Sequence, residues 1–194
     1  MTPSQNPVEE LLVKSGAIKE GHFLLSSGLR SNRYCQCATL FENPAYGGQM
    51  AEMMATKLRA EGVTPTVVLA PALGAILWGY EVARALGVRS LFAERPDGKT
   101  FALRRGFELH ANDRVLLAED VITTGGSILE LVPLVKAAGA ELIGYCCIAD
   151  RSRGAFKPAE PFHSLIKLEF QTWTAEEDPM AKAGSIAVKP GSRG

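Results

Sequence analysis

The sequence of 194 residues lacks the features that mark several large classes of protein. Its 21 acidic and 21 basic residues balance, so the chain has no basic surplus of the kind that most nucleic-acid binders carry. The longest apolar stretch, residues 67–80, is interrupted by proline and glycine and is too short to span a bilayer. No basic segment followed by an apolar run opens the sequence, so we expect a cytoplasmic protein without a secretory leader.

Cysteine and histidine are both scarce, and neither forms a recognisable ligand or nucleophile pattern. The four cysteines lie in two close pairs without C-x-x-C spacing or a nearby histidine for zinc, so we expect buried small residues within strands. The three histidines each stand alone, which predicts structural or surface roles. The residues concerned are Cys35, Cys37, Cys146, Cys147, His22, His110 and His163.

Two common phosphate-binding patterns are also missing. No lysine follows a glycine-rich turn as in a Walker A loop, and no G-x-G-x-x-G opens a helix as in a dinucleotide-binding fold. The chain does contain RVLLAEDVITTGGS at residues 114–127, where a short apolar run ends on two acids and passes into a hydroxyl-rich turn. The run is too short for a helix and predicts a buried parallel strand.

The turn at residues 123–127, called the cradle below, predicts a phosphate site. Apolar residues at helical spacing follow it, so a strand, a turn and a helix N-terminus would direct several backbone N–H groups at one point. The same residues also suit an ordinary capped turn. Glu119 and Asp120 would repel a bare phosphate, so their position favours a ligand that also carries ribose hydroxyls or a cation. A ribose 5-phosphate satisfies both requirements.

The first part of the chain predicts a small N-terminal unit, or hood, over residues 1–43. We expect a short helix at 8–15 and strands at 23–26 and 33–39, packed as a cover on a larger sheet because this unit is too small for its own core. At the other end we expect a C-terminal segment over 171–194, loosely held from about Lys182.

Between these segments, residues 44–170 alternate between strands and helices. Such alternation is typical of an α/β core with a parallel sheet covered by helices on both faces. The helix after the cradle contains Pro133, where we expect a bend. The expected helices are 44–58 and 76–86, and the expected strands are 66–70, 90–93, 115–118 and 141–149.

EDVITTGGS resembles the phosphoribosyl diphosphate signature of the type I phosphoribosyltransferases, in which two acids bind ribose hydroxyls and the turn binds the 5-phosphate. GHFLLSSGLRSNRY at residues 21–34 and the pair Asp150-Arg151 narrow the resemblance to the orotate phosphoribosyltransferases, over about residues 8–153. It implies the type I phosphoribosyltransferase fold and transfer of ribose 5-phosphate to orotate, giving orotidine 5′-phosphate and pyrophosphate in pyrimidine biosynthesis. It also implies Mg²⁺ held mainly through the substrate, a homodimer with shared active sites, and neither nucleic-acid nor membrane partners.

The resemblance also implies roles for individual residues. Catalysis is assigned to the two acids together with Arg95 and Lys99, which lie in a basic loop at 94–107 that reaches a neighbouring subunit's site. The residues implied for the diphosphate donor are Glu119, Asp120, Val121, Ile122, Thr123, Thr124, Gly125, Gly126 and Ser127, with Ala72, Leu73 and Gly74 in a second turn for the pyrophosphate. Those implied for orotate are Ser27, Tyr34, Thr123 and Arg151, with Ser26, Gly28 and Arg30 in the same loop as Ser27.

Several interpretations stay open at this stage. Leu25 and Leu73 occupy positions where many family members carry lysine, and the roles of Arg104 and Arg105 are undetermined. From the residues alone, the loop at 94–107 is a lid or a solvated hairpin, and an Asp-Arg pair at a strand end is often a surface ion pair. The alternative functions are a purine-base phosphoribosyltransferase and a non-catalytic nucleotide- or RNA-binding regulator of the same fold.

Overall fold

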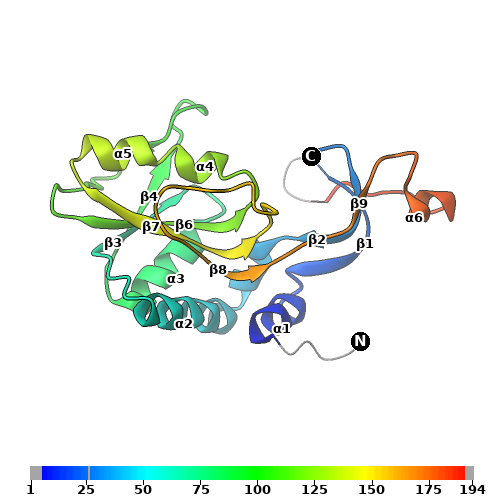
Figure 1. The fold of residues 1–194 in the computed structure, drawn as a ribbon, viewed down its shortest axis with the longest axis horizontal. Coiled ribbons are helices and arrows are strands. Elements are labelled where there is room, and N and C mark those ends of the chain that lie inside the picture. The colour runs from blue at the N-terminus through cyan, green and yellow to red at the C-terminus, as the bar shows by residue number, and fades with distance from the viewer. Residues whose placement is uncertain (1–5, 26, 191–194) are drawn as a thin grey trace. The chain divides into compact units, whose positions relative to one another are not determined.

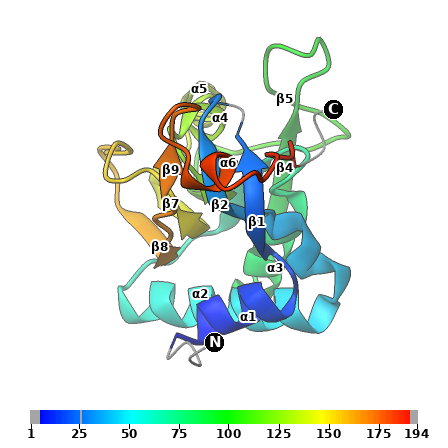
Figure 2. The ribbon, with the colours of Figure 1, turned by 90° about the vertical axis from the view of Figure 1, so that its right-hand side faces the viewer.

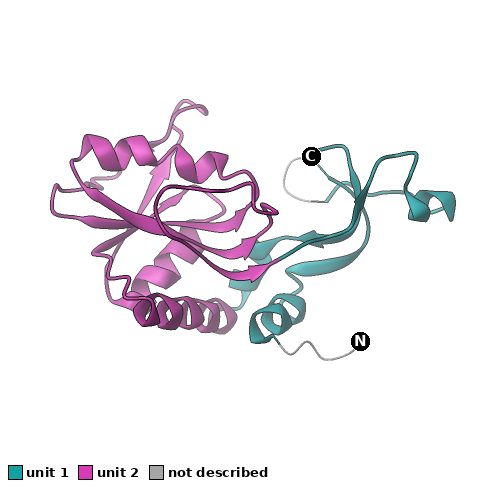
Figure 3. Ribbon diagram, viewed as in Figure 1, with its two compact units in different colours: residues 1–43, 168–194 teal, residues 44–167 magenta. Residues whose placement is uncertain are grey.

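The protein is described by a computed structural model covering residues 6–25 and 27–190. The chain divides into two units, one of residues 1–43 with 168–194 and one of residues 44–167 (Figure 3). Within the described residues, no helix is both long enough and apolar enough to cross a membrane.

A six-stranded sheet forms the centre of the larger unit (Figure 1). Its strands are β3 (Val67–Pro71), β4 (Arg89–Glu94), β5 (Ala102–Leu103), β6 (Arg114–Ile122), β7 (Glu141–Asp150) and β8 (Phe162–Lys167). They lie in the order β5-β4-β3-β6-β7-β8, and every pair is parallel except β4 with β5. This confirms the predicted α/β class with a mostly parallel sheet.

Helices cover both faces of this sheet, as expected for strands that are apolar on both sides. On one face, α2 (Pro44–Ala60) and α3 (Ile76–Leu86) pack together; on the other lie α4 (Gly126–Leu129) and α5 (Val132–Ala137). The expected bend at Pro133 is wrong, because the helix is broken into α4 and α5. Pro133 stands in the first turn of α5, where its missing N–H removes no helical hydrogen bond.

The strand order reverses between β3 and β6. From β3 the chain moves outward to β4, then returns to pair on the other side of β3 and continues outward through β7 and β8. Loops that leave β3 and β6 at their carboxyl ends therefore diverge, which leaves the crevice where open α/β sheets bind ligands. The turn at residues 72–74 and the cradle follow these two strands.

The smaller unit contains a three-stranded antiparallel sheet in the order β1-β2-β9 (Figure 2). Its elements are α1 (Pro7–Lys14), β1 (Ile18–Leu24), β2 (Arg30–Cys35), the 3₁₀ helix η1 (Cys37–Glu42), β9 (Thr172–Trp173) and α6 (Pro179–Lys182). The predicted strand bounds were wrong here. An irregular register between Glu20 and Phe23 breaks the alternation that would reveal β1, and residues 37–39 lie in η1 rather than in a strand.

The C-terminal segment is hydrogen-bonded to β1. The Leu24 N–H donates to the Val188 carbonyl at 2.8 Å, and the Val188 N–H donates to the His22 carbonyl at 2.9 Å. The His22 ring also lies 2.6 Å from a buried carboxylate oxygen of Asp178 and 3.0 Å from the Ser185 hydroxyl. The expectation of a loosely held tail from Lys182 is therefore wrong as far as Val188. The backbone of Val188 forms hydrogen bonds with backbone groups at the edge of β1.

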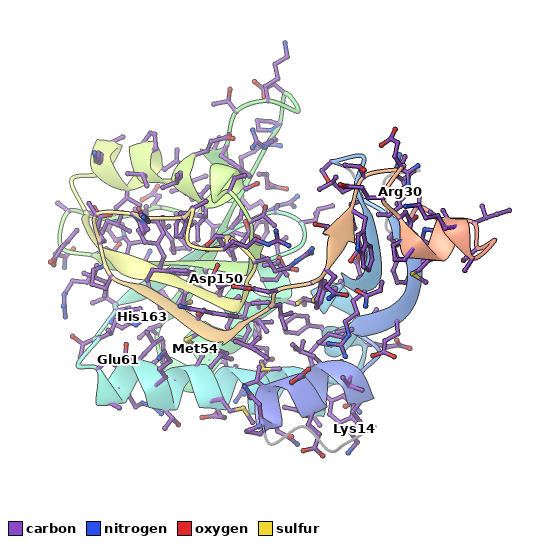
Figure 4. All side chains as sticks on the ribbon, turned by 45° about the vertical axis from the view of Figure 1, so that its right-hand side comes forward. Lys14, Arg30, Met54, Glu61, Asp150 and His163 are labelled. Atoms are coloured by element: carbon purple, nitrogen blue, oxygen red, sulfur yellow. The ribbon has the colours of Figure 1, made fainter. Side chains whose placement is uncertain are left out.

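The remaining histidines and the cysteines have the structural or surface roles expected of them. His163 on β8 lies 2.5 Å from Glu61, which directly follows α2. Figure 4 labels both residues. His110 is exposed. All four cysteines are buried, although Cys37 begins η1 instead of lying in a strand.

Asp113, directly before β6, forms hydrogen bonds with residues at the amino ends of β3 and β4. Its carboxylate accepts hydrogen bonds from Arg89 at 2.9 Å, from the Thr66 hydroxyl at 3.2 Å and from the His110 N–H at 2.8 Å. Burial acts to raise the pKa of Asp113, but these hydrogen bonds and the Arg89 charge outweigh it and lower the pKa.

Asp113→Asn should therefore lower the free energy of unfolding by about 1–3 kcal/mol at pH 7, since it weakens several hydrogen bonds to a buried charge. A carboxylate with a lowered folded-state pKa stabilises only while it is ionised, so the difference should persist down to about pH 4 and shrink below it. Urea unfolding of both proteins from pH 7 to pH 3 measures this, with the exposed Glu176→Gln as control. A difference that does not change with pH would contradict the electrostatic explanation.

Candidate active site

The cradle is positioned by the end of β6 and the start of α4. Gly125 adopts a left-handed conformation with φ +77°, and a Cβ at this position would lie 2.2 Å from a ring carbon of Phe156. Only glycine allows the backbone to turn this close to the buried Phe156 ring. Gly125 therefore contributes only backbone atoms to the pocket described next.

A pocket of about 260 Å³ opens over the cradle. It brings together most residues that the sequence predicted for the donor and adds Glu130, which was missed. A signal existed, because Glu130 follows Ser127 by three residues in a helical turn and such residues share one face. The lining residues are Glu119, Val121, Ile122, Thr123, Thr124, Gly125, Gly126, Ser127 and Glu130.

The two acids lie within the paired end of β6 and not beyond it as expected, because the longer β7 extends the pairing to Ile122. Burial, the charge of Asp120 and their mutual hydrogen bond raise the pKa of Glu119 to about 8. Burial also raises the pKa of Asp120, although the Val121 N–H and the Glu119 carboxyl donate hydrogen bonds that oppose the rise. A bound cation, or sugar hydroxyls that donate hydrogen bonds, would reduce the repulsion between the Glu119 and Asp120 carboxylates.

The turn after β3 lies beside the acidic pair. A Cβ on Gly74 would be 3.8 Å from a carboxylate oxygen of Asp120, so this turn lies beside the end of β6, across the reversal in strand order. Leu73 is 83% exposed, and its side chain supplies no charge to this turn. Any anion bound there would depend on backbone groups or on a cation from elsewhere.

Arg151 is anchored at the same edge of the sheet. It directly follows β7, and its backbone N–H donates to the Ile122 carbonyl at the end of β6, at 2.8 Å. The structure thus brings together the residues after β3, β6 and β7, which are separate in the sequence.

The loop at 94–107 is a hairpin whose ends pair as β4 and β5. Its tip is closed by Asp97, which accepts hydrogen bonds from the N–H groups of Lys99 and Thr100 at 2.8 and 2.7 Å. Arg105 pairs with Glu94 at 2.8 Å, whereas Lys99 is exposed. Arg95 lies 2.8 Å from Glu130, so it reaches the pocket of its own chain.

Comparison with known proteins places this arrangement in a family. Residues 36–181 match the phosphoribosyl transferase domain. The orotate phosphoribosyltransferase of Caldanaerobacter subterraneus is 48% identical over 186 residues, covering 96% of each chain. That of Thermotoga maritima is 46% identical over 187 residues, covering 96% of this chain and 98% of the relative.

The chain belongs to the orotate phosphoribosyltransferase family. The orotate phosphoribosyltransferase of Aeropyrum pernix has the same fold, with a TM-score of 0.70 at 22% identity, covering 83% of this chain and 93% of that one.

The acceptor residues that the family resemblance implies in the smaller unit lie in and after the turn between β1 and β2. Ser27 is exposed in the turn between β1 and β2, which Arg30 closes by donating to the Gly28 carbonyl at 2.6 Å. The Tyr34 hydroxyl donates to the Gln36 side chain at 3.0 Å. Ser26 lies outside the described residues, and the roles of these side chains toward an acceptor stay predictions.

Gly125→Ala should lower the free energy of unfolding by about 2–3 kcal/mol, because left-handed backbone and overpacking against Phe156 are both unfavourable for a residue with a Cβ. Gly126→Ala is the matched control, since a Cβ there would have Thr124 at 3.7 Å as its nearest neighbour. Chemical unfolding of both variants makes the comparison. Equal effects would show that close packing at position 125 is not what requires glycine.

Proposed function

We propose that this protein transfers the ribose 5-phosphate group from phosphoribosyl diphosphate to orotate, forming orotidine 5′-phosphate and pyrophosphate in the synthesis of UMP. The enzyme is a pentosyltransferase. The observation that carries the proposal is the convergence of the cradle, the acidic pair, the turn at 72–74 and Arg151 at one edge of the sheet. In chemistry, the cradle suits a phosphate, the acidic pair a ribose, the turn at 72–74 a diphosphate and Arg151 a carboxylate.

The reaction needs positioning and fixed charge more than a nucleophilic side chain. The bond between the anomeric carbon and the pyrophosphate oxygen breaks while a bond to the orotate ring nitrogen forms, and charge develops on the sugar carbon and the leaving group. Glu119 and Asp120 hold the ribose hydroxyls and stabilise a cationic sugar, while residues 123–127 hold the 5-phosphate. The backbone of Ala72, Leu73 and Gly74 is available for the pyrophosphate.

The acidic pair also suits Mg²⁺, because its half-buried carboxylates supply the hard oxygen ligands that this ion prefers. We propose that Mg²⁺ is held mainly through the diphosphate donor, with Glu119 and Asp120 as the chain's contribution. When bound, the ion would offset the negative charge of the departing pyrophosphate.

We propose that orotate is bound by Arg151, together with Thr123, Ser27 and Tyr34. A guanidinium group binds a planar carboxylate through two parallel hydrogen bonds. Orotate carries such a carboxylate, whereas uracil and the purine bases do not. The relatives at 42–48% identity are named orotate phosphoribosyltransferases, which favours this acceptor over a purine base.

We propose a homodimer in which Lys99, exposed on the hairpin, reaches the pyrophosphate in the partner's site. Leu73 stands where many family members carry lysine, so its side chain gives the turn at 72–74 no positive charge. This supports the proposal that a lysine of another subunit supplies the positive charge for the pyrophosphate. Sedimentation velocity at assay concentrations tests this, and an active monomer would exclude it. We also propose a cytoplasmic location, which the four buried thiols support because reducing compartments preserve thiols.

The proposed reaction is tested by mixing purified protein, phosphoribosyl diphosphate and Mg²⁺ with one base at a time and following pyrophosphate release. Orotate should give orotidine 5′-phosphate, whereas adenine, guanine, hypoxanthine and uracil should give little product. Faster release with a purine would favour the purine enzyme. Binding of phosphoribosyl diphosphate without release with any base would favour the non-catalytic regulator.

A further inference from the structure

Phe156 connects the two loops that follow β6 and β7 in the larger unit. The residue is only 6% exposed, and its ring lies against Gly125 on the side where a Cβ would stand. The three atoms nearest to such a Cβ all belong to this ring, at 2.2, 2.3 and 3.3 Å. Gly125 caps the start of α4, and its carbonyl accepts a hydrogen bond from the Leu129 N–H at 3.0 Å. The Phe156 ring therefore supports the backbone at the middle of the cradle.

The ring is itself held by two other aromatic side chains. Tyr145 on β7 and Phe162 on β8 pack edge to face with it, with ring centroids at 5.5 and 5.0 Å and interplanar angles of 89° and 85°. Such pairs favour a defined angle between the rings, beyond the effect of burial alone. The Tyr145 hydroxyl also donates to Glu160 at 3.2 Å. Two strands of the sheet thus determine where the Phe156 ring lies, and the ring determines where Gly125 lies.

The residues just before Phe156, 151–155, form the turn after β7, called the acceptor turn below because Arg151 is its first residue. Local hydrogen bonds close this turn. The Asp150 carboxylate accepts from the Ser152 N–H at 2.8 Å, and the Ser152 carbonyl accepts from the Ala155 N–H at 2.9 Å. The acceptor turn is therefore held at one end by β7 and at the other by the packing of Phe156.

We propose that Phe156 is a positioning residue for both substrates, whose ring sets the place of the cradle while its backbone fixes the end of the acceptor turn. The ring is buried and lies outside the set of residues that line the pocket over the cradle, so it acts through Gly125 and Arg151. The inference rests on the proposed function, since it concerns the sites for the donor's 5-phosphate and the orotate carboxylate.

Phe156→Met tests this role, because methionine keeps an apolar side chain of similar size but is flexible and has no flat face to pack on Gly125. Ribose 5-phosphate binding, measured by calorimetry on the full-length chain, should weaken about fivefold to tenfold, roughly the contribution of one hydrogen bond. The KM for orotate, from pyrophosphate release, should rise by a similar factor. If Phe156→Met does not fold, Phe156→Leu takes its place in the same measurements.

Two control variants separate positioning from general stability. Tyr145→Phe removes the contact with Glu160 but keeps the ring that packs on Phe156. Met54→Ala creates a cavity on α2, which covers the other face of the sheet, and should lower the melting temperature. Both variants should keep the wild-type affinity for ribose 5-phosphate and the wild-type KM for orotate.

The inference is overturned if Phe156→Met binds ribose 5-phosphate as the wild type does, or if only one of the two substrates is affected. It is also overturned if Met54→Ala loses as much affinity as Phe156→Met, because reduced stability would then explain both. None of these results touches the proposed function while the wild type releases pyrophosphate with orotate. A wild type without that release would refute the proposed function, and ribose 5-phosphate binding would still decide whether Phe156 positions the cradle.

Discussion

Asp120→Asn is expected to lower kcat by roughly 100-fold or more, the usual effect of removing one preorganised electrostatic partner of a transition state. The substitution keeps the size of the side chain and its place near the end of β6. It removes the carboxylate charge that lies beside Gly74. A cationic sugar would then lose stabilisation that the neutral amide does not replace.

The same substitution, Asp120→Asn, should not lower the stability of the protein. Glu119 and Asp120 are two half-buried carboxyls with raised pKa values, so replacing one of them removes an unfavourable interaction. The melting temperature of Asp120→Asn should equal or exceed that of the wild type. Asp113→Asn provides the contrast, since it should lose stability but keep its turnover per folded molecule. Near-normal turnover in Asp120→Asn would refute the assignment of the acidic pair to the ribose.

Arg151→Ala should raise the KM for orotate strongly and leave donor binding nearly unchanged. The loss expected for a charge-assisted pair that leaves a carboxylate without its partner is about 2–5 kcal/mol. That is roughly 30-fold to several-thousandfold in KM at 25 °C. The effect should fall on the acceptor because Arg151 follows β7, while the cradle for the donor follows β6.

Steady-state kinetics with each substrate varied in turn measures the split, and uracil serves as an acceptor without a carboxylate. Arg151→Ala should reduce the preference for orotate over uracil, whereas Arg151→Lys should keep part of it because lysine retains charge without the planar fork. The exposed Arg153→Ala is the control in the same loop. Equal losses for donor and acceptor would indicate that Arg151 has a structural role.

Much of the cradle could be read from the sequence because its determinants are local. The apolar run before Glu119 identified a buried strand, and the glycines after Thr124 identified a tight turn, as the left-handed Gly125 confirms. The class of the fold followed from the alternation of such strands with helices. The extension of β6 to Ile122 was missed, because it results from pairing with β7 and not from the residues of β6 themselves.

Other features depend on segments that are far apart in the chain. Periodicity shows which face of an element is buried but not which element buries it, so no local pattern linked Val188 to β1 or His163 to Glu61. The same holds for Glu130 and Arg95. Their meeting requires the hairpin after β4 and the helix after β6 to approach one another, which depends on the fold of the sheet.

By itself, the sequence determined the α/β class, the cradle, the acidic pair and the family, because these depend on short-range backbone preferences and on contiguous motifs. Only the tertiary structure decided that the turn at 72–74 lies beside Asp120, that Arg151 is anchored to the end of β6, and that Arg95 faces Glu130 in its own chain. The physical reason is that the order of strands in a sheet is set by packing among distant segments, and that order determines which loops become neighbours.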